Sequence, residues 1–152
     1  MKVETLLSNL SRDLGATLQL DGEHKCRIVY EDRLDIYLES NEERELLHVY
    51  ALLCPIPKEY RLELYEMLLS EHLMGFGSGN AVFGECPRIG ELMFFREIDM
   101  DEMDYHEFLV ALQNFVKAHD FWTERISEEF HLRHEDHVSP DVLLKRNGQD
   151  LV

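Results

Sequence analysis

The middle of the chain carries an apolar pattern that a single hydrophobic core does not explain. The spacing predicts a helix from Lys58 to Met74, and at about 100° per residue its apolar positions fall on two nearly opposite sides. One side holds Tyr60, Leu64, Met67, Leu68 and Met74, and the other holds Leu62, Leu69 and Leu73. A helix on one core needs only one apolar stripe, so we expect this helix to contact two bodies. In a chain this small, the second body is expected to be another protein.

The two ends of the predicted domain are also helical. Apolar residues recur at helical spacing over 3–14, and Gly15 follows where a C-terminal helix cap is expected. The opposite side of that helix is polar, so we expect one face to lie on a sheet. Asp104 and Glu107 are spaced as a capping box, and they predict the start of a last helix over 105–126.

Five strand-like runs lie between the predicted helices. They span 26–30, 34–39, 46–53, 81–83 and 92–95. The second run alternates apolar and polar residues, as a half-buried strand does, whereas the third is almost continuously apolar and predicts at least partial cover on both faces. Short charged or glycine-containing turns join the runs, which favours antiparallel hairpins. Pro55 and Pro57 are expected to end the third strand and begin the middle helix.

The predicted order is therefore helix, three strands, helix, two strands, helix. This is an α+β domain with an antiparallel five-stranded sheet and three helices, and it occupies residues 1–126. Over 127–152 the periodicity is lost, and we predict an acidic, histidine-rich C-terminal tail that is partly disordered.

The composition describes a globular, reduced and strongly acidic protein. Of its 152 residues, 45% are hydrophobic and 30% are charged, which suits one domain with a core. The net charge of −16 disfavours nucleic acid and anionic membranes as partners. The sequence has no run of about 18 apolar residues, so we expect no membrane insertion. Cys26, Cys54 and Cys86 form no C-x-x-C pair, which predicts reduced thiols in a cytosolic protein.

Two clusters suggest ligand sites but have simpler interpretations. The glycine-rich segment 75–79 alternates like a phosphate loop, yet it follows a helix and precedes a strand, so a helix cap and a turn fit better. His131, His134 and His137 would spread over about 120° of a helix, whereas chelating pairs usually lie at i and i+4. We therefore expect solvated histidines, with a metal-dependent enzyme as the alternative.

Other acidic and histidine residues give no support to catalysis. Asp99, Asp101 and Asp104 lack the glycine and the final glutamate of a calcium loop, and a strand exit and a helix cap account for them. His72 and His119 fall on apolar helical sides, where we expect core or interface histidines and not catalytic bases. The sequence predicts no cofactor and no catalytic constellation, and it favours a binding protein that dimerises.

Two segments show a particular order of elements. The first is ELYEMLLSEHLMGFGSGNAVFG, a helix ending in leucines, a glycine-rich turn and a short strand. The second is GELMFFREIDMDEMDYHEFLVALQNFVKAHDFW, a strand, an acidic loop and a helix that ends near an aromatic residue. Together with the opening helix, Leu18 and Leu20, this order resembles the class I type III secretion chaperones, the Tir-chaperone (CesT-like) family of bacterial pathogens. The resemblance covers residues 2–126.

The resemblance implies a small acidic homodimer in the bacterial cytoplasm. Such proteins bind the N-terminal chaperone-binding segment of one or more effectors, keep it extended and soluble, and deliver it to the secretion apparatus and its ATPase. The family's dimer contact, on the second helix and the next strand, implies Leu62, Leu69, Leu73 and Val82, or the opposite side with Leu64 and Leu68. Effector contacts on the first helix and the sheet, often with an added edge strand, imply Leu18, Leu20, Ile28, Tyr30, Ile36 and Leu38, some of them core.

A second hypothesis keeps the same fold but changes the partner. In it the protein is a regulatory adaptor that binds a folded cytosolic protein. The partners retained in a pull-down distinguish the two hypotheses, because secreted proteins favour the chaperone, whereas transcription or signalling proteins favour the adaptor.

Overall fold

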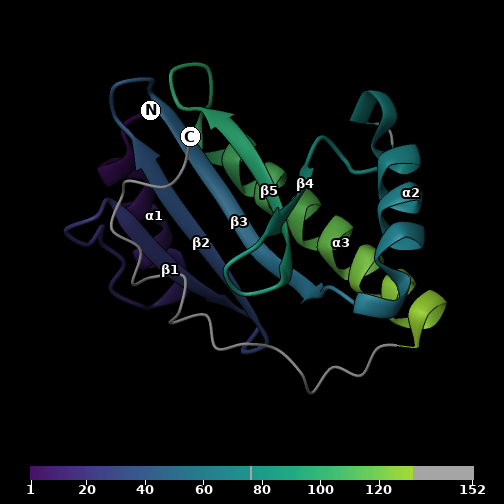
Figure 1. The fold of residues 1–152 in the computed structure, drawn as a ribbon. Helices are drawn as coiled ribbons and strands as arrows, with labels where there is room; N and C mark the ends of the chain where they lie inside the picture. The colour runs from purple at the N-terminus through teal and green to yellow at the C-terminus, as the bar shows by residue number, and fades with distance from the viewer. Residues whose placement is uncertain (76, 132–152) are drawn as a thin grey trace. The chain divides into compact units, whose positions relative to one another are not determined.

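The computed structural model describes residues 1–75 and 77–131, and it confirms the predicted α+β order of helices and strands. The helices are α1 (Val3–Leu14), α2 (Arg61–His72) and α3 (Tyr105–Phe130), and two short 3-10 turns, η1 (Lys58–Tyr60) and η2 (Leu73–Gly75), flank α2. The strands are β1 (Lys25–Tyr30), β2 (Leu34–Asn41), β3 (Leu46–Pro55), β4 (Val82–Cys86) and β5 (Glu91–Asp99). They form one sheet in the order β1-β2-β3-β5-β4 (Figure 1).

The chain divides into two compact units, and β3, β5 and α3 contribute residues to both. The first unit comprises Met1–Ala51 and Phe95–Lys117, and the second comprises Leu52–Phe94 and Ala118–Val152. Each unit has its own fully buried side chains, such as Ile36 and Phe108 in the first and Leu64 and Trp122 in the second.

In the first unit, alternation along the strands separates a buried face from a more polar one. Ile28 lies opposite Ile36 in the antiparallel pair of β1 and β2, and both side chains are buried. The helix α1, drawn behind these strands in Figure 1, buries Leu6, Leu7 and Leu10, which confirms its single apolar side. Strand residues of the other parity point to the opposite face of the sheet.

In the second unit, side chains of α3 contact both α2 and β4. Arg125 forms an ion pair with Glu71 at an N–O distance of 3.0 Å and lies over the Trp122 ring, 5.2 Å from its centroid. The fully buried Trp122 meets Phe83 of β4 edge-on, with 5.1 Å between the ring centroids. Side chains near the end of α3 therefore pack against both α2 and β4.

The strand β3 is fully covered on one face and partly covered on the other. Its odd-numbered residues over 47–53 are buried, and the residues between them are half-buried. Tyr50, one of the half-buried residues, stacks on Tyr37 of β2 with 5.4 Å between the ring centroids. Contacts between neighbouring strands thus shield the second apolar row of this run.

The strand β5 is longer than the run predicted over 92–95, because it continues to Asp99. Ile98 is buried and Glu97 is exposed, so the alternation persists through charged residues. In the strand order, β5 stands between β3 and β4. Backbone hydrogen bonds of an interior strand do not depend on apolar side chains. A strand predicted from its apolar run alone is therefore shorter than the strand that forms.

The last helix also extends beyond the predicted end at Ile126, because α3 ends at Phe130. The Phe130 side chain is 9% exposed, and its ring centroid lies 5.9 Å from that of Tyr60 in η1. This contact between distant parts of the sequence accounts for the extra turn. The predicted start of the tail at residue 127 falls inside the helix, and residues 132–152 lie outside the described part of the chain.

Replacing Phe130 tests whether the last turn of α3 belongs to the core. We expect Phe130→Ala to lower the free energy of unfolding by about 3 kcal/mol, because a large buried ring is lost. The matched variant Phe121→Ala removes a ring that is 53% exposed, and its cost should stay near or below about 1 kcal/mol. Urea unfolding followed by circular dichroism measures both variants, and equal losses contradict the assignment.

Candidate partner-binding surfaces

The structure separates the two apolar sides of α2. Leu64 and Leu68 are only 0% and 4% exposed, and they belong to the core of the second unit. Leu62, Leu69 and Leu73 are 66%, 72% and 71% exposed. Of the two alternatives for a dimer contact, the side with Leu64 and Leu68 is therefore occupied by the fold itself. The opposite side remains available to a partner.

The short turn η2 carries a further exposed apolar residue beyond the end of the helix, and it is one that the periodicity predicted on the side of Leu64. Met74 is 81% exposed and has a left-handed backbone, with φ of 60°. Val82, the other residue predicted at a dimer contact, is half-buried at the start of β4. We define the α2 surface as Leu62, Leu69, Leu73 and Met74. A cluster of large exposed apolar side chains of this kind is typical of an interaction site.

The outer edge of β1 is the second candidate surface. The strand stands at one end of the strand order and pairs with β2. The Ser40 N–H donates to the His24 carbonyl oxygen at 2.9 Å. Because such bonds alternate along an antiparallel pair, the backbone groups of Lys25, Arg27 and Val29 face the outer edge. An edge of this kind is a template for an added strand.

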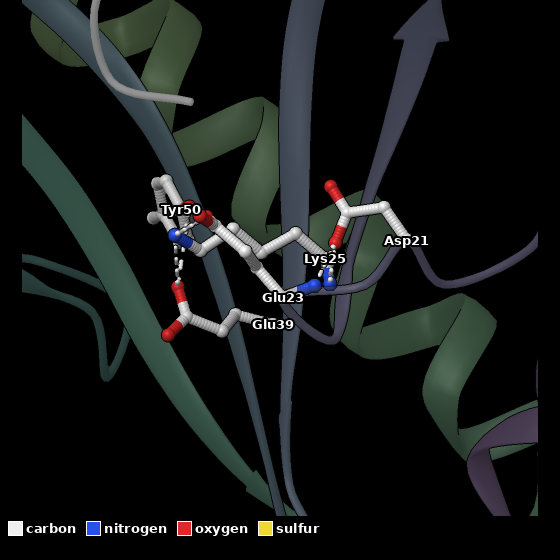
Figure 2. A network of polar contacts seen from close by, with 5 residues as sticks. All are labelled: Asp21, Glu23, Lys25, Glu39 and Tyr50. Atoms are coloured by element: carbon white, nitrogen blue, oxygen red, sulfur yellow. Dashed lines mark hydrogen bonds and ion pairs between the residues drawn. The ribbon is translucent and has the colours of Figure 1, made fainter. Parts of the chain in front are cut away.

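A polar network fixes the beginning of β1 (Figure 2). The Asp21 carboxylate accepts hydrogen bonds from the N–H groups of Glu23 at 2.8 Å and Lys25 at 2.9 Å. The Asp21 N–H in turn donates to the Lys25 carbonyl oxygen at 2.8 Å. The Lys25 ammonium lies 3.2 Å from Glu23 and 3.9 Å from Glu39, and Glu39 accepts a hydrogen bond from the Tyr50 hydroxyl at 3.4 Å. The outward backbone groups of Lys25 are thus satisfied, and the part of the edge considered for an added strand is the one around Val29.

The structure divides the six residues predicted to contact an effector. Leu18, Leu20 and Tyr30 are half-buried and reach the surface of the first unit. Ile28, Ile36 and Leu38 are buried in the core, because their parity along the strands turns them towards the covered face. These three residues stabilise the sheet and are not part of an exposed surface.

Two exposed apolar residues of the first unit were not predicted as contacts. Val29 is 47% exposed, and Leu14 is 52% exposed. The alternation of β1 carried the signal for Val29, since it has the parity opposite to Ile28. For Leu14 no such signal exists, because it continues the apolar stripe of α1 whose other members are buried or half-buried.

The side chains considered for catalysis have structural partners. His119 is 5% exposed, and its Nε2 lies 2.6 Å from the Leu52 carbonyl oxygen, which makes it a core histidine. His72 is half-buried in the last turn of α2, and its ring meets that of Phe83 edge-on with 5.8 Å between the centroids. The N–H of Glu107 donates to Asp104 Oδ1 at 2.8 Å, and the N–H of Asp104 donates to Glu107 Oε2 at 2.9 Å. The predicted capping box is therefore confirmed.

The thiols are likewise structural. Cys26, Cys54 and Cys86 are all free and buried, in agreement with the predicted reduced core thiols. Burial, followed by the negative charge of Glu91, raises the pKa of Cys54 to about 12, so this thiol remains protonated near neutral pH.

The histidines considered as metal ligands lie partly within the described residues and partly outside them. Within 1–75 and 77–131, no group of three histidine, cysteine or acidic side chains is placed to hold a metal ion. His131 is exposed, and His134 and His137 lie outside the described residues. In the same part of the chain, no helix combines the length and apolar character needed to cross a membrane.

Comparison with known proteins identifies the family. The model of the Tir chaperone protein (CesT) family matches residues 5–123, and the chain belongs to this family. No curated protein sequence matches the chain.

Solved structures share the fold at low sequence identity. A chain of the HopA1–SchA chaperone–effector complex has a TM-score of 0.67 and 21% identity, covering 80% of this chain and 92% of that one. A chain of the ExsC–ExsE complex has a TM-score of 0.69 and 20% identity, with 80% and 91% covered. A chain of the ExoU–SpcU complex from the type III secretion system of Pseudomonas aeruginosa has a TM-score of 0.63 and 14% identity, covering 81% of this chain and 96% of that one.

Tyr50 provides a pH-dependent test of the network at the start of β1. Burial, together with the negative charge of Glu39, raises the pKa of Tyr50 above its usual value of about 10. With the pKa raised in the folded state, the stabilisation is complete below about pH 10 and is lost as the pH rises towards the folded value. Between about pH 10 and 11.5, the wild type should therefore lose up to about 1.4 kcal/mol more per pH unit than Tyr50→Phe. Urea unfolding at fixed pH measures the difference, and parallel curves contradict the arrangement.

Proposed function

We propose that this protein is a type III secretion chaperone. It binds the N-terminal chaperone-binding segment of one or more secreted effectors, keeps that segment extended and soluble, and delivers it to the secretion apparatus and its ATPase. It acts by binding and not by catalysis, as a homodimer in the bacterial cytoplasm. The observation that carries this proposal is the family match over residues 5–123, which includes most of the described fold. The fold is also that of a chain in the HopA1–SchA chaperone–effector complex.

The β1 edge supports the binding of an extended segment. An added strand forms backbone hydrogen bonds around Val29, and its alternate side chains provide specificity. The exposed Val29 and the half-buried Leu18 and Leu20 offer apolar contacts on the same unit. Ordering a disordered segment costs several kcal/mol, and a handful of apolar side chains that contribute about 1.5–3 kcal/mol each offsets this cost.

The α2 surface supports the homodimer. A two-fold contact uses the same patch on both copies, so the four apolar side chains of one copy meet those of the other. Electrostatic repulsion opposes this association, because each copy carries a net charge of −16. The apolar contacts therefore have to supply the stabilising free energy of the dimer.

Co-expression with the N-terminal segments of secreted proteins from the same genome tests the proposed function. We expect one such segment to stay soluble and to co-purify with this protein. Val29→Pro should weaken its binding about tenfold, equivalent to about 1.4 kcal/mol, because proline removes an outward N–H without breaking a bond to β2. Val29→Ala keeps that N–H and should retain most of the affinity, measured by calorimetry.

The outcome of this experiment separates the two hypotheses for the fold. A strictly monomeric protein that retains no secreted segment contradicts the chaperone function. If only transcription or signalling proteins are retained, the regulatory adaptor is supported instead. Equal affinities of the proline and alanine variants contradict strand addition at β1. They do not contradict effector binding by another surface.

Leu69→Glu and Leu73→Glu test the proposed dimer. A carboxylate in the α2 surface has to lose its water on association but stays hydrated in the monomer. We expect the dimer dissociation constant to rise about 100-fold, measured by sedimentation equilibrium, without unfolding of the monomer. The neighbouring core variant Leu68→Ala should instead lower the free energy of unfolding by about 2–5 kcal/mol. A dimer that survives both glutamate variants contradicts this interface.

A further inference from the structure

We infer that a clamp around Gly77 sets the position of segment 73–74 and thereby controls self-association through the α2 surface. The clamp consists of Gly77, Glu71, Trp122 and Arg125, all of which belong to the second unit. The inference rests on the proposed homodimer. It assigns a positioning role to residues that do not themselves form the α2 surface.

Segment 73–74 lies between two anchored carbonyl groups. Before it, the Glu71 carbonyl oxygen accepts a hydrogen bond from the Gly77 N–H at 3.0 Å. After it, the Gly75 carbonyl oxygen accepts one from the Asn80 N–H at 3.4 Å. Both donors belong to the loop that follows the segment. The position of that loop therefore determines where the two exposed side chains of the segment lie.

The backbone of the segment leaves the α-helical conformation, although the Leu73 N–H still donates to the Ser70 carbonyl oxygen. The helix ends at His72, Leu73 has φ of −54° and ψ of 119°, and Met74 has φ of 60° and ψ of 12°. A left-handed backbone at a residue other than glycine costs about 1–2 kcal/mol. Contacts elsewhere must offset this cost, and the two anchors are the ones that flank the segment.

Position 77 has room only for glycine. An ideal Cβ there would lie 2.4 Å from the Glu71 carbonyl oxygen and 2.8 Å from Glu71 Oε2. The nearer atom belongs to the backbone of α2, so it cannot rotate away as the end of a side chain can. Gly77 is not among the glycines with positive φ. Close approach, and not backbone freedom, is therefore the reason for glycine at this position.

Trp122 and Arg125 hold the loop from α3. The Trp122 Nε1–H donates to the Gly77 carbonyl oxygen at 3.1 Å. Arg125 lies over the Trp122 ring and pairs with the Glu71 carboxylate. Both backbone groups of Gly77 are thus bonded, the N–H to α2 and the carbonyl to a fully buried ring.

A side chain at position 77 should consequently disturb the α2 surface without removing any of its residues. The added Cβ has to move the loop away from Glu71, and the anchors pass that movement to Leu73 and Met74. Leu62 and Leu69 lie on the helix itself and should keep their positions. The dimer then loses the part of its contact that η2 contributes.

Gly77→Ala and Gly22→Ala form the matched pair of variants. A Cβ at Gly22 meets nothing within 4 Å, and Gly22, like Gly77, is not among the positive-φ glycines. We expect Gly77→Ala to raise the dimer dissociation constant about tenfold and Gly22→Ala to leave it unchanged, measured by sedimentation velocity. Trp122→Phe removes the indole donor without adding an atom near Glu71, and it should weaken the dimer in the same direction.

A second readout follows the segment independently of the dimer. In the Leu69→Glu background, an isotope-labelled Met74 methyl group reports the position of segment 73–74 by NMR. We expect Gly77→Ala to shift this methyl resonance and Gly22→Ala not to. A wild-type protein that stays monomeric at all concentrations overturns the proposed homodimer. A dimeric wild type whose dissociation constant is unchanged in Gly77→Ala overturns the clamp, as does an unshifted Met74 resonance in that variant.

Discussion

A helix that is apolar on two sides cannot bury both of them inside a chain of this size. In the second unit, Leu64 and Leu68 enter the core, whereas Leu69 and Leu73 remain largely in water. That exposure is unfavourable for an isolated molecule, because each such side chain gains about 1.5–3 kcal/mol on complete burial. This exposure is the physical basis of the proposed homodimer. The high negative charge of the chain keeps such a surface soluble until the partner arrives.

The same balance between solubility and binding governs the edge of the sheet. An open strand edge binds any extended chain, including another copy, unless charge or capping restricts it. At β1 the Asp21 turn occupies the backbone groups of Lys25, and the charged side chains of Lys25 and Arg27 follow along the strand. Only the part of the edge around Val29 is left for an added strand. In the proposed function, the restriction that protects the edge from aggregation also limits where an effector segment pairs.

The glycine-rich turn shows how one pattern conceals different physical causes. Its sequence suggested a phosphate loop, and its position after a helix favoured a cap and a turn. The structure confirms a turn over 77–80, whereas the C-cap of α2 is Leu73, which precedes the glycines. Gly75 and Gly79 have positive φ, whereas Gly77 is needed for its close approach to the backbone of α2. Glycine spacing alone does not distinguish these causes, because the close approach of Gly77 to Glu71 exists only in the folded backbone.

The sequence by itself determined the kind and order of the elements, because periodicity follows from local backbone geometry. It determined the two-sided character of α2 and the capping box of α3, and in β2 it predicted the burial of Leu34, Ile36 and Leu38 but not that of Tyr37, which is 1% exposed. Only the tertiary structure decided which side of α2 faces the core, that Leu14 is exposed at the end of the apolar stripe of α1, and that α3 continues to Phe130. Each of these depends on contacts between segments far apart in the chain, such as the ring of Phe130 against that of Tyr60. Local spacing indicates which side chains share a side of a helix or strand, but only contacts across the fold decide which of two apolar sides is buried.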